Sequence, residues 1–137
     1  MKEYLEQKAL QYQTHEFIAK DPISIPHRYS LLQDIEIAGI LTATIAWGNR
    51  QAILKGASLM MDLLDDAPYE FVKGATPQDL QRLNNYVYRT FQQDDLPGFI
   101  RALQTIYSET NSLETLFTPK EGETIRNGIA RFRKKII

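Results

Sequence analysis

The sequence predicts an all-α protein with about six to eight helices arranged around one buried central helix. Three observations support this fold class. The stretch from Ile37 to Trp47 holds eleven residues without a charge, and a helix that is apolar nearly all round is stable in water only when other elements cover it. Apolar residues elsewhere recur at helical spacing. The one segment rich in strand-forming residues, 84–91, has no candidate partner strand.

Length and composition limit the class of protein. A length of 137 residues fits one domain with a single core, assigned to residues 1–137. The net charge of -1 lacks the basic excess typical of nonspecific DNA binding. With no cysteine, disulfides and thiolate metal sites are excluded. The N-terminus does not resemble a secretory signal, and no uncharged run reaches the roughly 20 residues of a membrane span. We therefore expect a cytoplasmic protein.

The N-terminal segment is expected to form short helices followed by a turning path. Helical spacing predicts a first helix over residues 2–12 and a short continuation at residues 14–18. The two prolines within residues 21–30 break any helix there. Ser30 and Gln33 have the spacing of a capping box, which would start the central helix.

The central helix is expected over residues 33–47 and, because it carries no charge from Ile37 on, to be the most buried helix of the domain. It leads into a tight turn. Gly48 is suited to the left-handed conformation that closes a helix end. Asn49 can then cap a second helix that begins at Arg50. The second helix would pack through apolar residues at helical spacing, namely Ile53, Leu54, Ala57, Met60, Met61 and Leu64. The pattern predicts a helical hairpin with a polar, positively charged tip.

The rest of the chain is expected to form shorter helices. Pro68 would end the second helix of the hairpin, and a short element near residues 69–72 would close at Gly74. Thr76 followed by proline opens a further helix, and residues 84–91 are interpreted as its end plus a turn.

Two more start signals and a last helix lie toward the C-terminus. Asp94 or Asp95 would cap a long helix, and Asn111 with Glu114 has the spacing of another capping box. A last helix is expected over residues 123–137, where five basic residues and no acidic one lie between Arg126 and Lys135. The C-terminus is therefore the basic end.

One candidate site is a cluster of polar residues: Asp21, His27, Arg28, Asp34 and Glu36, with Arg89 grouped with them. Asp34 and Glu36 do not share a helix face, so they make a poor metal pair. His15 and His27 have no supporting carboxylate spacing, so we expect no metal and no cofactor. The simpler interpretation places both carboxylates in a first helical turn, where the helix dipole favours negative charge.

The hairpin tip, Trp47 to Gln51, is the second candidate site. Backbone amides at the start of the second helix, with Arg50 beside them, would suit a phosphate. The alternative, an ordinary turn with a capping Asn49 and a solvated Arg50, fits the residues equally well. No nucleotide loop or nucleophile motif is present.

Three segments carry a resemblance: DPISIPHRY (21–29), DIEIAGILTATIAWGNRQAI (34–53) and YVYRTF (86–91). With them the chain resembles an uncharacterised bacterial family of conserved hypothetical proteins. The resemblance implies a protein about twice as long, whose second half is similar to the helix-hairpin-helix DNA glycosylases. In those enzymes a polar tip fills the gap left by a flipped base, which would put Asn49 at the gap and Arg50 beside it.

The chain departs from that superfamily downstream. Leu96-Pro97-Gly98 starts like its hairpin turn, but Ile100 stands where the turn needs a second glycine. Nothing after Gly98 matches the catalytic aspartate or lysine of those enzymes. We therefore expect the N-terminal half of such a protein, without glycosylase activity by itself.

Three functions remain open. The first is a DNA-interacting domain with duplex DNA at Asn49, Arg50 and Gln51, assisted by a basic helix that carries Arg131, Arg133 and Lys134. The second is a helical protein-interaction or structural module, expected to form a homodimer through an apolar face that a missing C-terminal half would cover. The third is a small-molecule enzyme built on Asp21, His27 and Arg28.

Overall fold

A computed structural model of the chain describes residues 1–136 and confirms the all-α class. Within these residues there are nine α-helices, two 3-10 helices and no strand, somewhat more helices than six to eight. Their bounds are α1 Lys2–Tyr12, α2 His15–Lys20, η1 Pro22–Ser24, η2 Pro26–Arg28, α3 Leu32–Ile45, α4 Arg50–Leu63, α5 Pro68–Gly74, α6 Pro77–Leu83, α7 Asp95–Glu109, α8 Glu114–Phe117 and α9 Ile125–Ile136.

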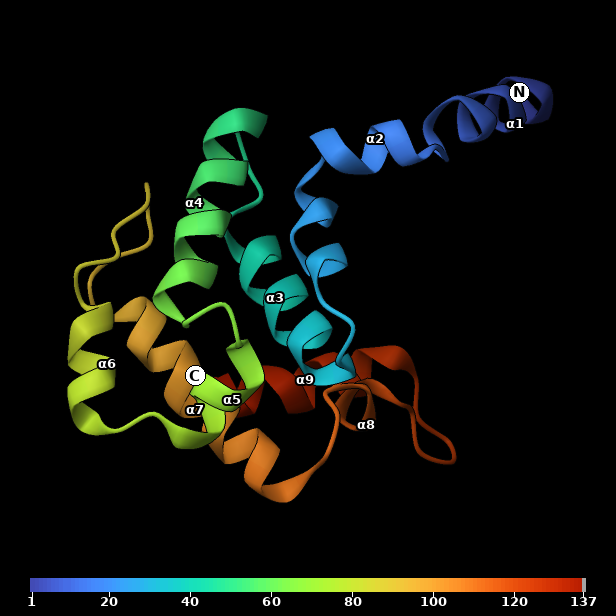
Figure 1. Ribbon diagram of the computed structural model, residues 1–137. Coiled ribbons are helices and arrows are strands. Elements are labelled where there is room, and N and C mark those ends of the chain that lie inside the picture. Colours follow the sequence, from blue (N-terminus) through green and yellow to red (C-terminus); the bar gives the residue numbers. More distant parts are fainter. Residues whose placement is uncertain (137) are drawn as a thin grey trace.

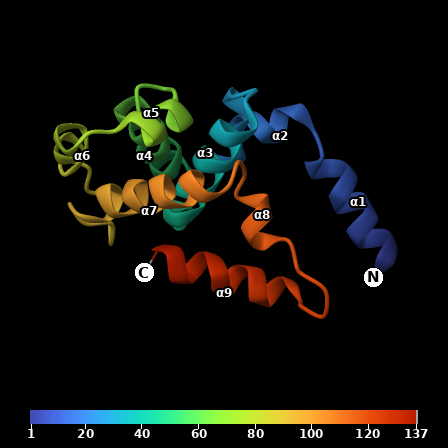
Figure 2. The same ribbon diagram turned by 90° about the horizontal axis from the view of Figure 1, so that it is seen from below.

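The core forms where α3, α4, α5 and α7 meet. The helix α3 contacts α4, α5 and the two 3-10 helices, while α7 contacts α5, α6 and α9 (Figure 1). Large side chains with no exposed area, such as Leu41, Met60 and Leu103, fill the space between them. By contrast, α1 extends away from the other helices and buries none of its residues (Figure 2).

The expectation that α3 is the most buried helix is wrong. It buries five of its 14 residues, whereas α7 buries seven of 15. The lack of charge on α3 does not mean that every face is covered, since Leu32 and Ile35 remain 50% and 36% exposed. The helix α7 is apolar on one side only, and that side lies against the core.

Several helix ends follow the sequence signals. Asn49 caps α4 through its side-chain oxygen, which accepts from the Ala52 amide at 3.0 Å. Thr76 forms a full capping box with Asp79, and the following proline is the first residue of α6. Residues 84–91 form a helix end and a turn, as expected, closed by an isolated bridge between Tyr88 and Phe91.

Two predicted capping boxes are wrong because tertiary contacts use the same groups. The residue that caps α3 is Leu31, without a side-chain bond, and the Gln33 side chain donates instead to the Asn111 carbonyl at 2.9 Å. The first amide of α8, at Glu114, is bound by the Ser112 hydroxyl and by the distant Glu36 carboxylate.

The turn between α4 and α5 also differs from the expectation. The helix α4 ends at Leu63, and Pro68 begins α5. Between them, Asp65 and Asp66 have positive φ angles of 57° and 51°, and the Asp66 amide donates to the Met61 carbonyl at 2.9 Å. Aspartate tolerates this left-handed conformation better than most residues, so the turn forms without a glycine.

Candidate functional site

The hairpin tip between α3 and α4 has the local geometry that its sequence predicts. The helix α3 stops at Ile45, and Gly48 follows with a φ of 94°. Only glycine adopts this conformation without strain. Residues 46–51 are all exposed, so the tip presents its side chains to solvent.

Arg89 stacks on the tip from the turn after α6. Its guanidinium carbon lies 4.8 Å from the centroid of the Trp47 ring and 5.7 Å from that of Tyr88. A Cβ atom on Gly48 would lie 2.4 Å from the Arg89 Nη1 atom. Glycine is therefore required at position 48 for its backbone angle, and it also leaves room for the close approach of the Arg89 side chain.

Arg89 itself is held in an unusual conformation. Its φ is 54°, within a turn where Tyr88 and Phe91 exchange two backbone hydrogen bonds of 3.1 and 2.8 Å. A positive φ on an arginine costs free energy that the surrounding contacts must offset. The stack on Trp47 and Tyr88 supplies such contacts.

The tip carries two cations with no carboxylate partner. Among residues 1–136, no ion pair is formed by Arg50 or Arg89. Arg50 lies over the Phe17 ring at 5.8 Å, and Trp47 is 46% exposed. Gln51 is exposed beside them. The arrangement offers positive charge beside a partly exposed indole. We call this the tip surface, consisting of Trp47, Asn49, Arg50, Gln51 and Arg89.

The structure brings together only part of the predicted polar cluster, since the charges of Arg28 and Asp34 both act on the pKa of Tyr29. Arg89 lies at the tip, whereas Asp21 caps η1 by accepting from the Ile23 amide at 3.0 Å. Asp34 lies in the first turn of α3, yet its carboxylate accepts from the Tyr69 amide of α5 at 2.8 Å. Arg28 donates to the Ser58 hydroxyl at 3.0 Å. These side chains join neighbouring elements to one another.

His27, the remaining member of the predicted cluster, lines a shallow surface cavity with Tyr29 and Ile35. The Tyr29 hydroxyl donates to Asp66 at 2.6 Å. Burial, and then this hydrogen bond, raises the pKa of Tyr29 above its ordinary value. Among residues 1–136, no group of three or more histidines and carboxylates is placed to hold a metal ion.

Glu36 also has a structural role. Its carboxylate accepts from the Tyr107 hydroxyl at 2.8 Å and from the Leu113 and Glu114 amides at 2.9 and 3.2 Å. Burial, followed by the bond to Glu36, raises the pKa of Tyr107, so this hydroxyl stays protonated and donates. The carboxylate thus joins α3 to α7 and to the start of α8.

The basic residues of α9 lie far from the tip. Figure 1 shows α9 at the lower end of the molecule and the start of α4 at the upper end. Arg131 donates to the Leu116 and Thr118 carbonyls at 3.1 and 2.7 Å and pairs with Glu123. Arg133 and Lys134 are exposed. The six residues predicted to bind DNA therefore occupy two separate surfaces.

Replacing Gly48 by Ala is expected to lower the free energy of unfolding by about 1–2 kcal/mol, the cost of a left-handed alanine, and to push Arg89 off Trp47. Because Trp47 is the only tryptophan, its fluorescence should report the loss of the stack. Gly74→Ala is the matched control, since a Cβ there meets nothing within 4 Å. Unchanged fluorescence in Gly48→Ala would contradict the stacked geometry.

Comparison with known proteins places the chain next to one family. A family model described as "Protein of unknown function (DUF2400)" matches residues 21–137, which leaves α1 and α2 outside the match. No curated protein and no solved structure matches the chain. None of the helices among residues 1–136 is long and apolar enough to cross a membrane.

Proposed function

Since the chain belongs to the DUF2400 family, whose function is unknown, we propose from its tip surface that it is a DNA-interacting helical domain. The observation that carries the proposal is the stack of Arg89 on Trp47 over Gly48. It holds an arginine without a carboxylate partner beside an exposed indole. The proposal keeps the expected likeness to the N-terminal part of the helix-hairpin-helix DNA glycosylases.

The chemistry of the tip surface fits a nucleic acid. Arg50 and Arg89 supply charge and N–H donors for phosphate oxygens, and an indole such as the partly exposed Trp47 can stack on a base. Asn49 uses its side-chain oxygen to cap α4, which leaves its amide NH₂ group as the donor for a base or phosphate. With a net charge of -1, binding would depend on these local cations.

We propose binding without a reaction for this chain. Two carboxylates of the predicted polar cluster, Asp34 and Glu36, accept hydrogen bonds from backbone amides of α5 and α8. A carboxylate used in this way is occupied in joining one helix to the next. The domain would therefore be catalytically incomplete, as its resemblance implies.

The test is a titration of a fluorescent duplex at two salt concentrations. Arg89→Ala and Arg50→Ala are each expected to weaken binding and to reduce the salt slope by about one, because each removes one phosphate contact. Lys134→Ala on α9 is the matched control and should behave as wild type. Equal curves for all four proteins, or no binding at low salt, would remove the tip surface as a DNA site.

A second candidate function is a protein-interaction module, favoured by the exposed helix α1. It has 11 residues and buries none of them, while Tyr4, Leu5 and Leu10 are 60%, 59% and 75% exposed. An isolated helix of this length is marginal in water, so a partner would stabilise it. If the partner is a second copy, sedimentation should show a dimer that Leu5→Glu dissociates. A monomer at high concentration would argue against this function.

A further inference from the structure

The helix α1 carries aromatic and basic side chains together on one face. Tyr4, Lys8 and Tyr12 follow one another at intervals of four residues, so they lie on the same side of the helix. The Lys8 Nζ atom is 5.8 Å from the centroid of the Tyr4 ring and 5.9 Å from that of Tyr12. The two tyrosines are 60% and 49% exposed. Since α1 buries none of its residues, these rings have no role in the core.

A chain of ring contacts continues from α1 to the hairpin tip. The Tyr12 ring meets the Phe17 ring of α2 edge to face, with the centroids 5.5 Å apart. The guanidinium carbon of Arg50, the first residue of α4, lies 5.8 Å from the centroid of the Phe17 ring. We call Tyr4, Lys8, Tyr12, Phe17 and Arg50 the aromatic row. Because Arg50 also belongs to the tip surface, the row leads from α1 to that surface.

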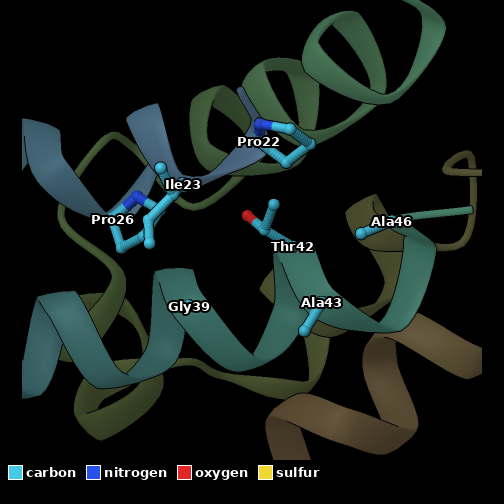
Figure 3. Close-up of a pocket in the computed structure, with 7 residues that line it drawn as sticks. All are labelled: Pro22, Ile23, Pro26, Gly39, Thr42, Ala43 and Ala46. Atoms are coloured by element: carbon cyan, nitrogen blue, oxygen red, sulfur yellow. The ribbon is translucent and has the colours of Figure 1, made fainter. Parts of the chain in front are cut away.

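The segment after α2 fixes where the row meets the tip. The 3-10 helix η1 contacts α2, α3 and α4, and η2 contacts α3. Figure 3 shows Pro22, Ile23 and Pro26 across from Gly39 and Thr42 of α3. A Cβ atom added at Gly39 would lie 3.9 Å from the Pro26 Cβ, so this proline lies close to the helix. The proline rings also restrict the backbone of the segment, which holds α2 beside the start of α4.

The charge along the row is positive. Glu3 and Glu6 lie about 140° and 160° away from Lys8 around the helix axis, so the face of α1 that carries the row has no carboxylate. Glu16, in the first turn of α2, is exposed. Within residues 1–136, neither Lys8 nor Arg50 forms an ion pair. The row therefore offers cations between exposed rings to an anionic ligand that contains flat groups.

Single-stranded nucleic acid has both of these properties. Each unpaired base offers a flat face that stacks on an aromatic side chain, while cations pair with the phosphates of the strand. Bases inside a duplex are covered on both faces by their neighbours, so two separate rings on a protein surface cannot stack on them. Tyr4 and Tyr12 are eight residues apart on α1, which corresponds to about 12 Å. This distance spans about three nucleotides of a stacked strand.

Building on the DNA binding proposed for the tip surface, we propose that the aromatic row binds a single-stranded segment next to the duplex. Bases stack on Tyr4 and Tyr12, while Lys8 and Arg50 pair with phosphates of the same strand. The tip surface holds the adjoining duplex, so the domain prefers a junction between duplex and single strand. Residues 1–20, which the family match leaves out, carry all of the row except Arg50.

The experiment measures fluorescence anisotropy with labelled DNA probes. The probes are a blunt duplex, the same duplex with a tail of about eight thymidines at the 5′ or the 3′ end, and the tail alone. Wild type should bind at least one tailed duplex about tenfold more tightly than the blunt one. The double variant Tyr4→Ala/Tyr12→Ala should lose this gain and keep its affinity for the blunt duplex. Lys8→Gln should reduce the salt slope for the tailed duplex alone, by about 0.7.

Leu10→Ala is the control within the same helix. Leu10 is 75% exposed and lies about 160° from Lys8 around the axis, so this variant should bind every probe as wild type does. Because α1 buries no residue, all of these variants should unfold at the wild-type temperature.

The probes separate the row from the tip surface. Equal binding of blunt and tailed duplexes would overturn the role of the row and leave the tip as a duplex site. Binding of the tail alone through the two tyrosines, without binding of the blunt duplex, would support the row and remove the duplex site at the tip. No binding of any probe would overturn both. A double variant that keeps the tail preference but dissociates a dimer in sedimentation would make the row a contact between two copies of the chain.

Discussion

Replacing Leu41 by Ala is expected to lower the free energy of unfolding by about 2–5 kcal/mol, the range for deeply buried large-to-small changes. Leu41 is 0% exposed at the middle of α3 and belongs to the main core cluster. Its removal leaves a cavity in this core cluster, and close-packed neighbours relax only in part. Urea unfolding followed by circular dichroism measures the change.

The neighbouring residue provides the control for Leu41. Ile40 is only partly buried and packs at the edge of the same cluster, so Ile40→Ala should cost less, about 1–2 kcal/mol. The sequence alone gives no reason to separate the two positions, because both lie in the uncharged run. A loss below about 0.5 kcal/mol for Leu41→Ala would mean that this part of α3 lies on the surface.

Local signals in the sequence predicted the helix ends that depend on neighbouring residues. Gly48, Asn49 and the Thr76-Pro77 pair act within one turn of the chain, and the structure confirms each. The first helix also has its expected bounds. Such signals work because capping bonds span only two or three residues, so no knowledge of the tertiary fold is needed to find them.

The features that the sequence did not predict involve groups whose partners are distant in sequence. Arg89 belongs to the predicted polar cluster with Asp21 and His27, but the turn after α6 brings it to Trp47 and Gly48. The YVYRTF segment stood out in the sequence, yet nothing within it indicates which helix its arginine meets. Likewise, the Asp65-Asp66 turn forms without glycine, and partners from other elements, Arg82 for Asp65 and Tyr29 for Asp66, hold it.

Glu36 is the clearest example of such a distant partnership, and its loss should be severe. Glu36→Ala is expected to lower the free energy of unfolding by about 3 kcal/mol. The substitution removes the acceptor for the Tyr107 and Ser112 hydroxyls and for the Leu113 and Glu114 amides. Partly buried donors left unpaired cost about 1–3 kcal/mol each, and those that reach water cost less.

Two further variants separate this network from a general effect of charge. Glu36→Gln keeps one acceptor oxygen and should lose about half as much stability as Glu36→Ala, because some of the four donors stay bound. Glu114→Ala removes an exposed carboxylate from the first turn of α8 and should change stability by no more than about 0.5 kcal/mol. Thermal unfolding should place Glu36→Ala about 10 °C below wild type. If Glu36→Ala and Glu114→Ala proved equally stable, the four bonds would contribute nothing, and the attachment of α8 would have to come from the buried Leu113 side chain.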